Sequence, residues 1–445
     1  MQASWSSESG GWQLAAELCR RYRTQPQKAD QLLLALPNSI RQTERRRCQF
    51  LFFAALRHRG RIDAVLAELV RRSPRAKLKS LLEVALGELI TIRGPYGLGA
   101  PTLADVAQTV DHATGVIKRL LSTREAGFAN AVLRKATPLL DAQEAQLAAQ
   151  PTAADLLATT FSHPLWLVQR WLATFGPEAT RALLAWNQQP PDRFLRRTAR
   201  GRRDNYSPDP TCLVPTDFPE FFRYVGNDWN PVEAALSAGW LYAQDPSTRL
   251  PVELAQVQPG EAILDACAAP GGKSLALAEA LGESGNLVAI DRPGSRLNAL
   301  RQNLTKLPES PRRRVEVLEC DLLEDALERL QNAQLPTQFD AIVLDAPCTN
   351  TGVLRRRPDA KWRLTPEDFA RQTDLQDRLL DAVLPLLKPG GRLVYSTCSI
   401  DPEENRARVD ALRQRHPGLN VEAEHLSFPW KHAHDGAGAF RLRNG

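Results

Sequence analysis

Five short apolar runs between residues 261 and 398 constrain the fold of this chain more than any other feature. They cover residues 261–267, 286–291, 314–321, 339–347 and 391–398, and helical patterns separate most of them. Continuous apolar runs of this length are typical of strands buried on both faces, as in a parallel sheet covered by helices. We therefore predict a doubly wound, Rossmann-like α/β fold for this part of the chain.

Each predicted strand ends in polar or reactive residues. They are Asp265 and Cys267, Asp291, Asp321, Asp345 and Cys348, and Cys398. Ligands of parallel sheets bind at the carboxyl ends of the strands, so we expect these side chains to line one site. A single aspartate after a strand is commonly a helix N-cap, but the recurrence at four successive strand ends favours a functional site.

The loop after the first of these strands reads DACAAPGGKS, residues 265–274. Its Gly-Gly-Lys-Ser end suggests a phosphate-binding loop, but that motif needs a glycine where Cys267 stands. The Gly-x-Gly-x-x-Gly fingerprint of NAD-binding folds is absent as well. A glycine-rich turn followed by Asp291 still fits a nucleoside whose ribose hydroxyls donate to a carboxylate, and Asp321 can accept from an adenine amino group. S-adenosyl-L-methionine fits this pattern, with Asp345 at the centre of the cleft.

The front of the chain is basic and helical. Residues 1–150 hold 22 Lys and Arg against 13 Asp and Glu, whereas the remainder holds 35 against 38. Apolar residues repeat at helical spacing over residues 62–70 and 78–89, and no convincing strand precedes about residue 190. Such a basic excess is typical of nucleic-acid binding, although a solvated helix face remains an alternative. We predict that Arg45, Arg46 and Arg47 contact RNA phosphates.

A polar, alanine-rich stretch broken by Pro151 predicts a domain boundary near residues 140–155. We divide the chain into an all-α RNA-binding domain (1–145), a linker with a small RNA-recognition subdomain (146–240) and the Rossmann-like domain (241–445). The start of the chain lacks a secretion signal, and the longest apolar run is too short to span a membrane. Seven scattered cysteines form no zinc-binding or disulfide pattern. We expect a cytoplasmic monomer without a metal or a membrane partner.

Two regions resemble known families. The sequences RRRCQFLFFAALRHRGRIDAVL and EAGFANAVLRK resemble the NusB antitermination factor, a small RNA-binding bundle. The motifs DACAAPGGK, LDAPCTNTGV, RRRPDAKW and YSTCSIDPEEN resemble those of the RNA cytosine carbon-5 methyltransferases of the Fmu/Sun (NOL1/NOP2/sun) family.

This resemblance implies an S-adenosylmethionine-dependent methyltransferase that acts on 16S (small-subunit) ribosomal RNA. The implied cofactor-binding residues are Cys267, Ala268, Ala269, Pro270, Gly271, Gly272, Lys273, Asp291, Asp321 and Asp345. It also implies that Cys398 is the nucleophile, which adds to carbon-6 of cytosine, and that Cys348 assists release. Asp345, if protonated or sharing a proton with ring nitrogen 3, would stabilise the charge that develops there.

Two departures from the family pattern concern the site. The family usually has Ser, then Gly or Ala, after Asp-Ala-Pro-Cys, whereas this chain has Thr349 and Asn350, and its closing segment reads HDGAGAFRLRNG. Both departures predict weaker positioning of the base. Two alternatives stay open: an RNA-binding assembly factor without turnover, and the same chemistry on transfer RNA or DNA. Cys398 argues against DNA, because DNA cytosine methyltransferases lack the Thr-Cys motif.

Overall fold

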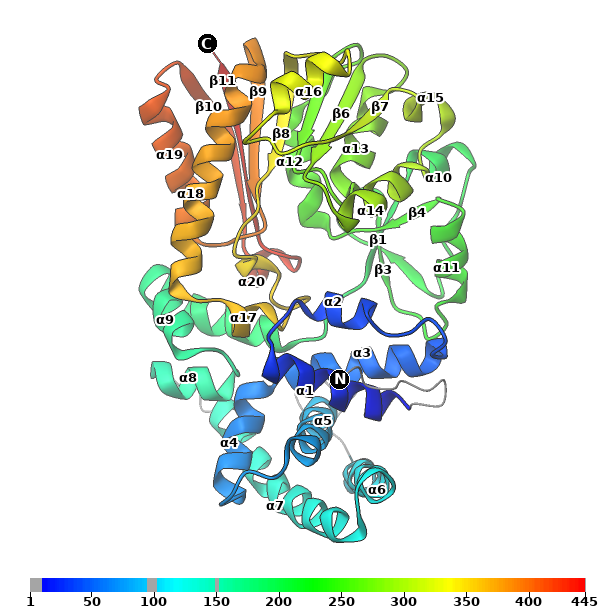
Figure 1. The fold of residues 1–445 in the computed structure, drawn as a ribbon, viewed down its shortest axis with the longest axis vertical. Coiled ribbons are helices and arrows are strands. Elements are labelled where there is room, and N and C mark those ends of the chain that lie inside the picture. Colours follow the sequence, from blue (N-terminus) through cyan, green and yellow to red (C-terminus); the bar gives the residue numbers. More distant parts are fainter. Residues whose placement is uncertain (1–9, 94–101, 149–151, 445) are drawn as a thin grey trace. The chain divides into compact units, whose positions relative to one another are not determined.

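The structure is a computed structural model that describes residues 10–93, 102–148 and 152–444. The chain divides into two compact units (Figure 1). Unit 1 contains residues 1–190 together with residues 354–364, and unit 2 contains residues 191–353 and 365–445. The predicted division of the chain at residues 145 and 240 stays a prediction.

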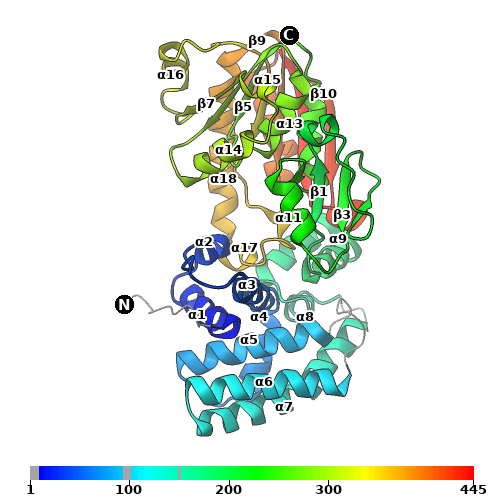
Figure 2. The same ribbon diagram turned by 90° about the vertical axis from the view of Figure 1, so that its right-hand side faces the viewer.

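The secondary structure of unit 1 consists of helices alone among its described residues. Its helices are α1 (Gly11–Thr24), α2 (Ala29–Leu34), α3 (Gln42–Arg57), α4 (Arg59–Leu69), α5 (Ala76–Arg93), α6 (Leu103–Leu120), α7 (Thr123–Ala148), α8 (Ala154–Thr160), α9 (Leu165–Gln188) and α17 (Ala360–Arg363). Figure 2 shows α5, α6 and α7 side by side. The apolar faces of α1, α3, α5, α6 and α7 form one core, as the helical spacing of the sequence predicts.

Residues 354–364 belong to unit 1 although they lie far along the chain. The Tyr22 hydroxyl donates to the Asp359 carbonyl at 2.9 Å, and the Trp362 indole donates to the Leu56 carbonyl at 2.7 Å. The Lys361 ammonium is 1% exposed and donates to the Arg57 carbonyl at 3.0 Å. Burial, and then the nearby Arg57 charge, lower the pKa of Lys361 well below its ordinary value. The motif RRRPDAKW is therefore built into the helical unit.

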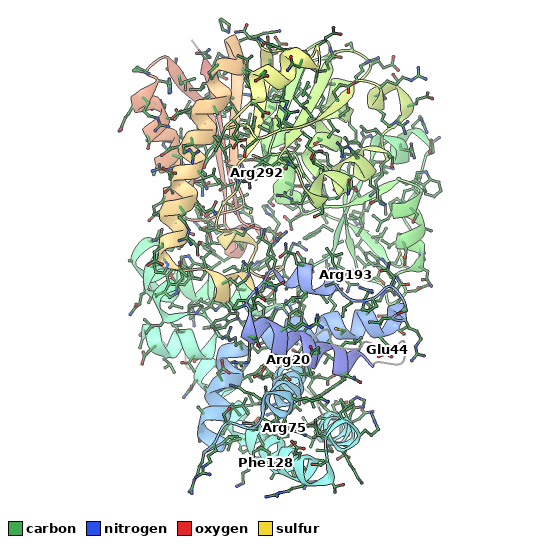
Figure 3. The ribbon with its side chains drawn as sticks, viewed as in Figure 1. Arg20, Glu44, Arg75, Phe128, Arg193 and Arg292 are labelled. Carbon is green, nitrogen blue, oxygen red and sulfur yellow. The ribbon has the colours of Figure 1, made fainter. Side chains whose placement is uncertain are left out.

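The arginines of α3 have different surroundings. The Arg45 guanidinium donates to the carbonyls of Leu33, Leu36 and Pro37 at 2.8 to 3.1 Å, so it holds the end of α2 and the turn after it. Its contact with RNA stays a prediction, and these bonds give Arg45 a structural role within unit 1 as well. Arg47 forms an ion pair with Glu88. Figure 3 labels Arg75, which pairs with Glu125 at 2.6 Å on the surface of the same unit.

Unit 2 contains a seven-stranded sheet in the order β10-β11-β9-β8-β5-β6-β7. Its strands are β5 (Ala262–Ala266), β6 (Asn286–Asp291), β7 (Val315–Glu319), β8 (Phe339–Asp345), β9 (Leu387–Thr397), β10 (Leu419–Ser427) and β11 (Ala437–Asn444). Strands β5 to β9 are parallel, and β11 pairs antiparallel with both β9 and β10. The five predicted strands and the Rossmann-like fold are confirmed. The altered closing segment still forms β11 in full register with β9.

Both faces of this sheet are covered, because successive side chains of a strand point to opposite faces. Ile263, Ala341 and Val343 pack with α12 (Arg249–Ala255), α13 (Gly272–Leu281) and α14 (Ser295–Leu304). Leu264 and Ile342 pack on the other face with α16 (Ala326–Asn332), α18 (Pro366–Val383) and α19 (Arg406–Arg415). This double burial explains why the strands read as continuous apolar runs.

A second, antiparallel sheet of unit 2 has the order β2-β3-β1-β4. Its strands are β1 (Phe194–Arg197), β2 (Leu213–Pro215), β3 (Phe221–Tyr224) and β4 (Leu241–Ala243). The remaining helices of unit 2 are α10 (Ala199–Arg203), α11 (Asn230–Ser237), α15 (Glu309–Arg312) and α20 (Pro429–His432). Among the described residues, no helix of either unit is long and apolar enough to cross a membrane.

Candidate active site

The strand order reverses direction at β5, because β6 lies on one side of it and β8 on the other. The loops that leave β5 and β8 therefore diverge and leave a crevice at the carboxyl ends of the strands. A cavity of about 230 Å³ at this point is lined by the loop after β5, by Asp345 at the end of β8, and by Tyr242 and Gln244 from and just after β4. The predicted site residues of β5 and β8 thus meet in one place.

The loop after β5 needs its glycines. Gly271 has a φ of +101°, and a Cβ there would lie 2.7 Å from Leu300 Cδ1. Only glycine adopts this backbone without strain and allows α14 to pack so closely. Residues Cys267, Ala268, Ala269, Pro270, Gly272 and Lys273 line the cavity. The loop thus presents backbone rather than bulky side chains to a ligand.

A second, smaller pocket lies on the other side of Cys267, which lines both. It is lined by Asp291 and Arg292 after β6, by Asp321 and Leu322 after β7, and by apolar residues that include Pro347. Figure 3 labels Arg292, which follows β6. The Asp291 carboxylate also accepts from the Ala269 amide at 2.8 Å, which fastens the loop to β6. Asp291 and Asp321 are therefore neighbours, as the strand-end pattern predicts.

Asp265 lies beneath the loop and is fully buried. Burial raises its pKa from 3.8 to about 7, although a hydrogen bond of 2.5 Å from the Ser274 hydroxyl and the nearby Lys273 charge oppose this. Its Oδ1 has no hydrogen-bond partner among the described residues. An ionised carboxylate is poorly stabilised here, because one of its oxygens is left without a donor.

Lys273 and Asp345 form the charged centre of the site. Lys273 Nζ lies 2.6 Å from Asp345 Oδ2, and the Ser396 hydroxyl donates to Asp345 Oδ1 at 3.0 Å. Burial lowers the pKa of Lys273, but the pairing with Asp345 outweighs it, and the pKa lies above its ordinary value. The sequence did not show that Lys273 reaches Asp345, so this pairing was not part of the role considered for Asp345 from the sequence, and that role stays a prediction.

The two cysteines predicted to act on the base lie side by side. Cys348 follows β8 and Cys398 follows β9, and their sulfur atoms are 3.2 Å apart. Cys348 is 9% exposed, whereas Cys398 is partly exposed. The hydrogen bond with Cys398, burial and the charge of Glu404 all raise the pKa of Cys348 well above its ordinary value. Cys348 is therefore a thiol that can donate to the Cys398 sulfur.

Glu404 holds the loop after Cys348, and the sequence argument did not single it out. It is fully buried, and its carboxylate accepts from the Thr349 amide at 2.9 Å, from the Thr349 hydroxyl and from the Gln376 amide at 3.0 Å. Gln376 also donates to the Pro347 carbonyl at 2.9 Å. The only signal in the sequence was the position of Glu404 within YSTCSIDPEEN. Thr349 thus keeps a hydroxyl that this network uses.

Known proteins resemble this chain over nearly its whole length. A family model described as 16S rRNA methyltransferase RsmB/F matches residues 252–438, and the NusB family model matches residues 13–138. Ribosomal RNA small subunit methyltransferase B of Cronobacter sakazakii is 31% identical over 430 residues, covering 92% of this chain and 91% of the relative. The enzyme of the same name from Yersinia pseudotuberculosis serotype O:1b is 31% identical over 447 residues, covering 96% of each chain. The chain belongs to the RsmB/F family of 16S rRNA methyltransferases.

Solved structures agree with this fold. The alignment with the crystal structure of PH0851 covers 99% of this RsmB/F chain and 100% of the PH0851 chain, with a TM-score of 0.73 and 21% identity. NSun6 from Pyrococcus horikoshii, solved with SFG, covers 63% of this chain and 98% of its own, with a TM-score of 0.53 and 19% identity. At these identities the likeness concerns the fold alone. The predicted NusB-like front and the Rossmann-like methyltransferase fold are both confirmed.

Proposed function

We propose that this RsmB/F protein methylates carbon-5 of a cytosine in 16S rRNA through a covalent bond between Cys398 and carbon-6 of the base. The observation that supports it most is the 3.2 Å separation of the Cys398 and Cys348 sulfurs at the carboxyl edge of the sheet. A nucleophile and a second thiol are both needed at one base if attack and release are divided between them.

The residues at the switch point fit S-adenosylmethionine as the methyl donor. The loop from Cys267 to Lys273 offers a close approach of backbone, and the carboxylates of Asp291 and Asp321 accept from ribose hydroxyls and an adenine amino group. When bound, the cofactor supplies an electrophilic methyl group on a sulfonium. The protein residues provide the remaining chemistry.

Attack makes carbon-5 nucleophilic. The Cys398 thiolate adds to carbon-6, and the electron pair of the carbon-5 to carbon-6 double bond becomes available at carbon-5, with negative charge that spreads to ring nitrogen 3. The Lys273 ammonium donates to the Asp345 carboxylate across 2.6 Å, and the cation of this pair stabilises that charge as it develops. Asp345 thus acts together with Lys273 rather than as a lone acid.

Release restores the aromatic ring. A base takes the hydrogen from carbon-5 as a proton, the electron pair of that bond re-forms the double bond to carbon-6, and the Cys398 sulfur departs as a thiolate. Cys348 stays a thiol because its pKa is raised, and it donates to the departing sulfur. A hydrogen bond to the charged form makes the thiolate a better leaving group.

Unit 1 supplies the RNA-binding surface in this proposal. Exposed basic side chains lie on α3, α6 and α7. They are Arg46, Lys118, Arg119, Arg124, Arg134 and Lys135. Clustered cations of this kind release counterions from an RNA backbone and provide affinity without reading sequence.

The test is transfer of radiolabelled methyl to purified 16S rRNA, with nuclease mapping of the labelled nucleotide. We expect label in 5-methylcytidine at one position. Label on transfer RNA alone would identify the substrate as transfer RNA. An RNA-binding protein that transfers no methyl to either RNA would be a non-catalytic assembly factor.

The covalent protein–RNA adducts that the two cysteine variants form distinguish the roles of Cys398 and Cys348. Cys398→Ala should abolish transfer and form no adduct, whereas Cys348→Ala should methylate and then accumulate a protein–RNA species that survives denaturing gels. RNA that carries 5-fluorocytidine should trap the wild-type protein similarly, because fluorine blocks the final deprotonation. If Cys398→Ala formed the adduct and Cys348→Ala turned over freely, the two roles would be reversed.

A further inference from the structure

Asn350 closes a ring of hydrogen bonds that contains both cysteines. Its Nδ2 donates to the Cys348 carbonyl at 2.7 Å, and its Oδ1 lies 3.4 Å from the Cys398 sulfur. The Cys348 carbonyl can only accept, so the amide nitrogen must face it and the amide oxygen must face Cys398. The Cys398 thiol therefore donates to Asn350, and the 3.2 Å contact between the two sulfurs completes the ring.

The backbone at this position restricts which residues are tolerated. Asn350 has a φ of +64°, in the left-handed region that glycine and asparagine adopt most readily. Its side chain reaches two groups that a glycine or alanine at this position would not contact. The departure from the family pattern thus adds two contacts to the loop rather than strain.

We propose that Asn350 is a positioning residue that holds the Cys398 thiol and its proton in the resting site. This inference rests on the proposed role of Cys398 as the nucleophile. The amide oxygen accepts from the thiol and has no donor for a thiolate, so the contact aligns the sulfur beside Cys348 and holds its proton.

Other charged and titratable groups around Cys398 also affect its thiol or thiolate. Lys273, from α13, attracts the thiolate, and Asp345, at the end of β8, is already paired with Lys273. Cys348 donates to the Cys398 sulfur, and Glu404, after β9, acts on Cys348. Asn350 therefore opposes Lys273, and removing its amide should shift the balance toward the thiolate.

Two variants change the amide without straining the backbone. Asn350→Gly keeps the left-handed conformation and removes both contacts, whereas Asn350→Asp keeps the shape and places a negative charge against the sulfur. Alkylation of the Cys398 peptide by iodoacetamide, measured by mass spectrometry from pH 5 to 10, reports thiolate formation without RNA or cofactor. We expect the alkylation midpoint of Asn350→Gly to fall by about 0.5 to 1 pH unit, and that of Asn350→Asp to rise by about 1.

The exposed Asn332 at the end of α16 provides a matched control. Asn332→Gly and Asn332→Asp should leave the alkylation midpoint of Cys398 unchanged. Asn350→Gly should also lower kcat for methyl transfer about 10-fold, without raising KM for S-adenosylmethionine, because the nucleophile is no longer held in line.

Equal midpoints for wild type and both Asn350 variants would overturn the proposal, as would opposite shifts to those expected. Failure of the proposed function looks different. If Cys398→Ala still methylated RNA, the nucleophile would be another residue, while the alkylation midpoints of the Asn350 variants would still report whether the amide holds the thiol.

Discussion

Substitution of Asp265 by asparagine tests the electrostatics beneath the loop after β5. In the wild-type protein, Asp265 is fully buried, has one hydrogen bond to its carboxyl group, from Ser274, and has a pKa of about 7 instead of 3.8. Between these two values the folded state binds more protons at Asp265 than the unfolded state does. The free energy of unfolding therefore falls as the pH rises through this window.

The magnitude follows from the size of the shift. One pKa unit corresponds to about 1.4 kcal/mol, so ionising Asp265 costs the folded protein about 4 kcal/mol once the pH lies well above 7. About 2.5 kcal/mol of this cost develops between pH 5 and pH 8. The asparagine of Asp265→Asn keeps a carbonyl acceptor for Ser274 and cannot ionise. We expect the variant to gain about 2.5 kcal/mol relative to wild type over this interval.

Urea unfolding at pH 5, 6, 7 and 8, followed by circular dichroism, gives the two free energies of unfolding. Hydrogen–deuterium exchange of the β5 peptide identifies the transition of unit 2. The exposed Asp374→Asn, whose side chain is 73% accessible, is the control and should show the wild-type dependence on pH. A difference between Asp265→Asn and wild type that stayed constant from pH 5 to pH 8 would refute the argument that Asp265 is protonated in the folded state.

Three further predictions concern the cofactor pocket, the helical unit and RNA. Asp291→Ala should raise KM for S-adenosylmethionine about 10- to 100-fold. Asp291→Asn should raise it by less, because asparagine still accepts from the Ala269 amide. An unchanged KM would show that Asp291 does not contact the cofactor. Lys361→Met should reduce the rise in the free energy of unfolding that we expect for wild type as the pH increases toward 10, because the lowered pKa of Lys361 lets the unfolded state bind more protons there. A rise of wild-type size in urea titrations of the variant would contradict this. Arg46→Ala combined with Arg124→Ala should lower the slope of log affinity against log salt for 16S rRNA by up to about 2, and identical slopes would place the binding surface elsewhere. Arg45→Ala should instead lower the free energy of unfolding, because its guanidinium donates to three backbone carbonyls.

The sequence by itself predicted the five parallel strands of the large sheet and the reactive residues at their carboxyl ends, but it did not predict β10. Strand positions were predictable because burial on both faces leaves a local record, a run of apolar residues that ends at a polar one. Asp291, Asp321, Asp345, Cys348 and Cys398 could be assigned to one edge for the same reason, since parallel strands bring their carboxyl ends together. The helices of unit 1 were equally readable from their apolar spacing.

Contacts between distant parts of the chain were decided only by the tertiary structure. Lys273 and Asp345 are 72 residues apart in the sequence, and Glu404 and Thr349 are 55 residues apart. No local sequence pattern therefore predicts either contact. The same holds for residues 354–364, which join helices more than 300 positions earlier in the chain. Asn350 is the clearest example. The sequence shows only that it departs from a family pattern. The orientation of its side chain depends on the Cys348 carbonyl, which can only accept, and on the Cys398 thiol at the end of the neighbouring strand. Hydrogen bonds and ion pairs are specific in distance and direction, and the folded backbone alone sets both.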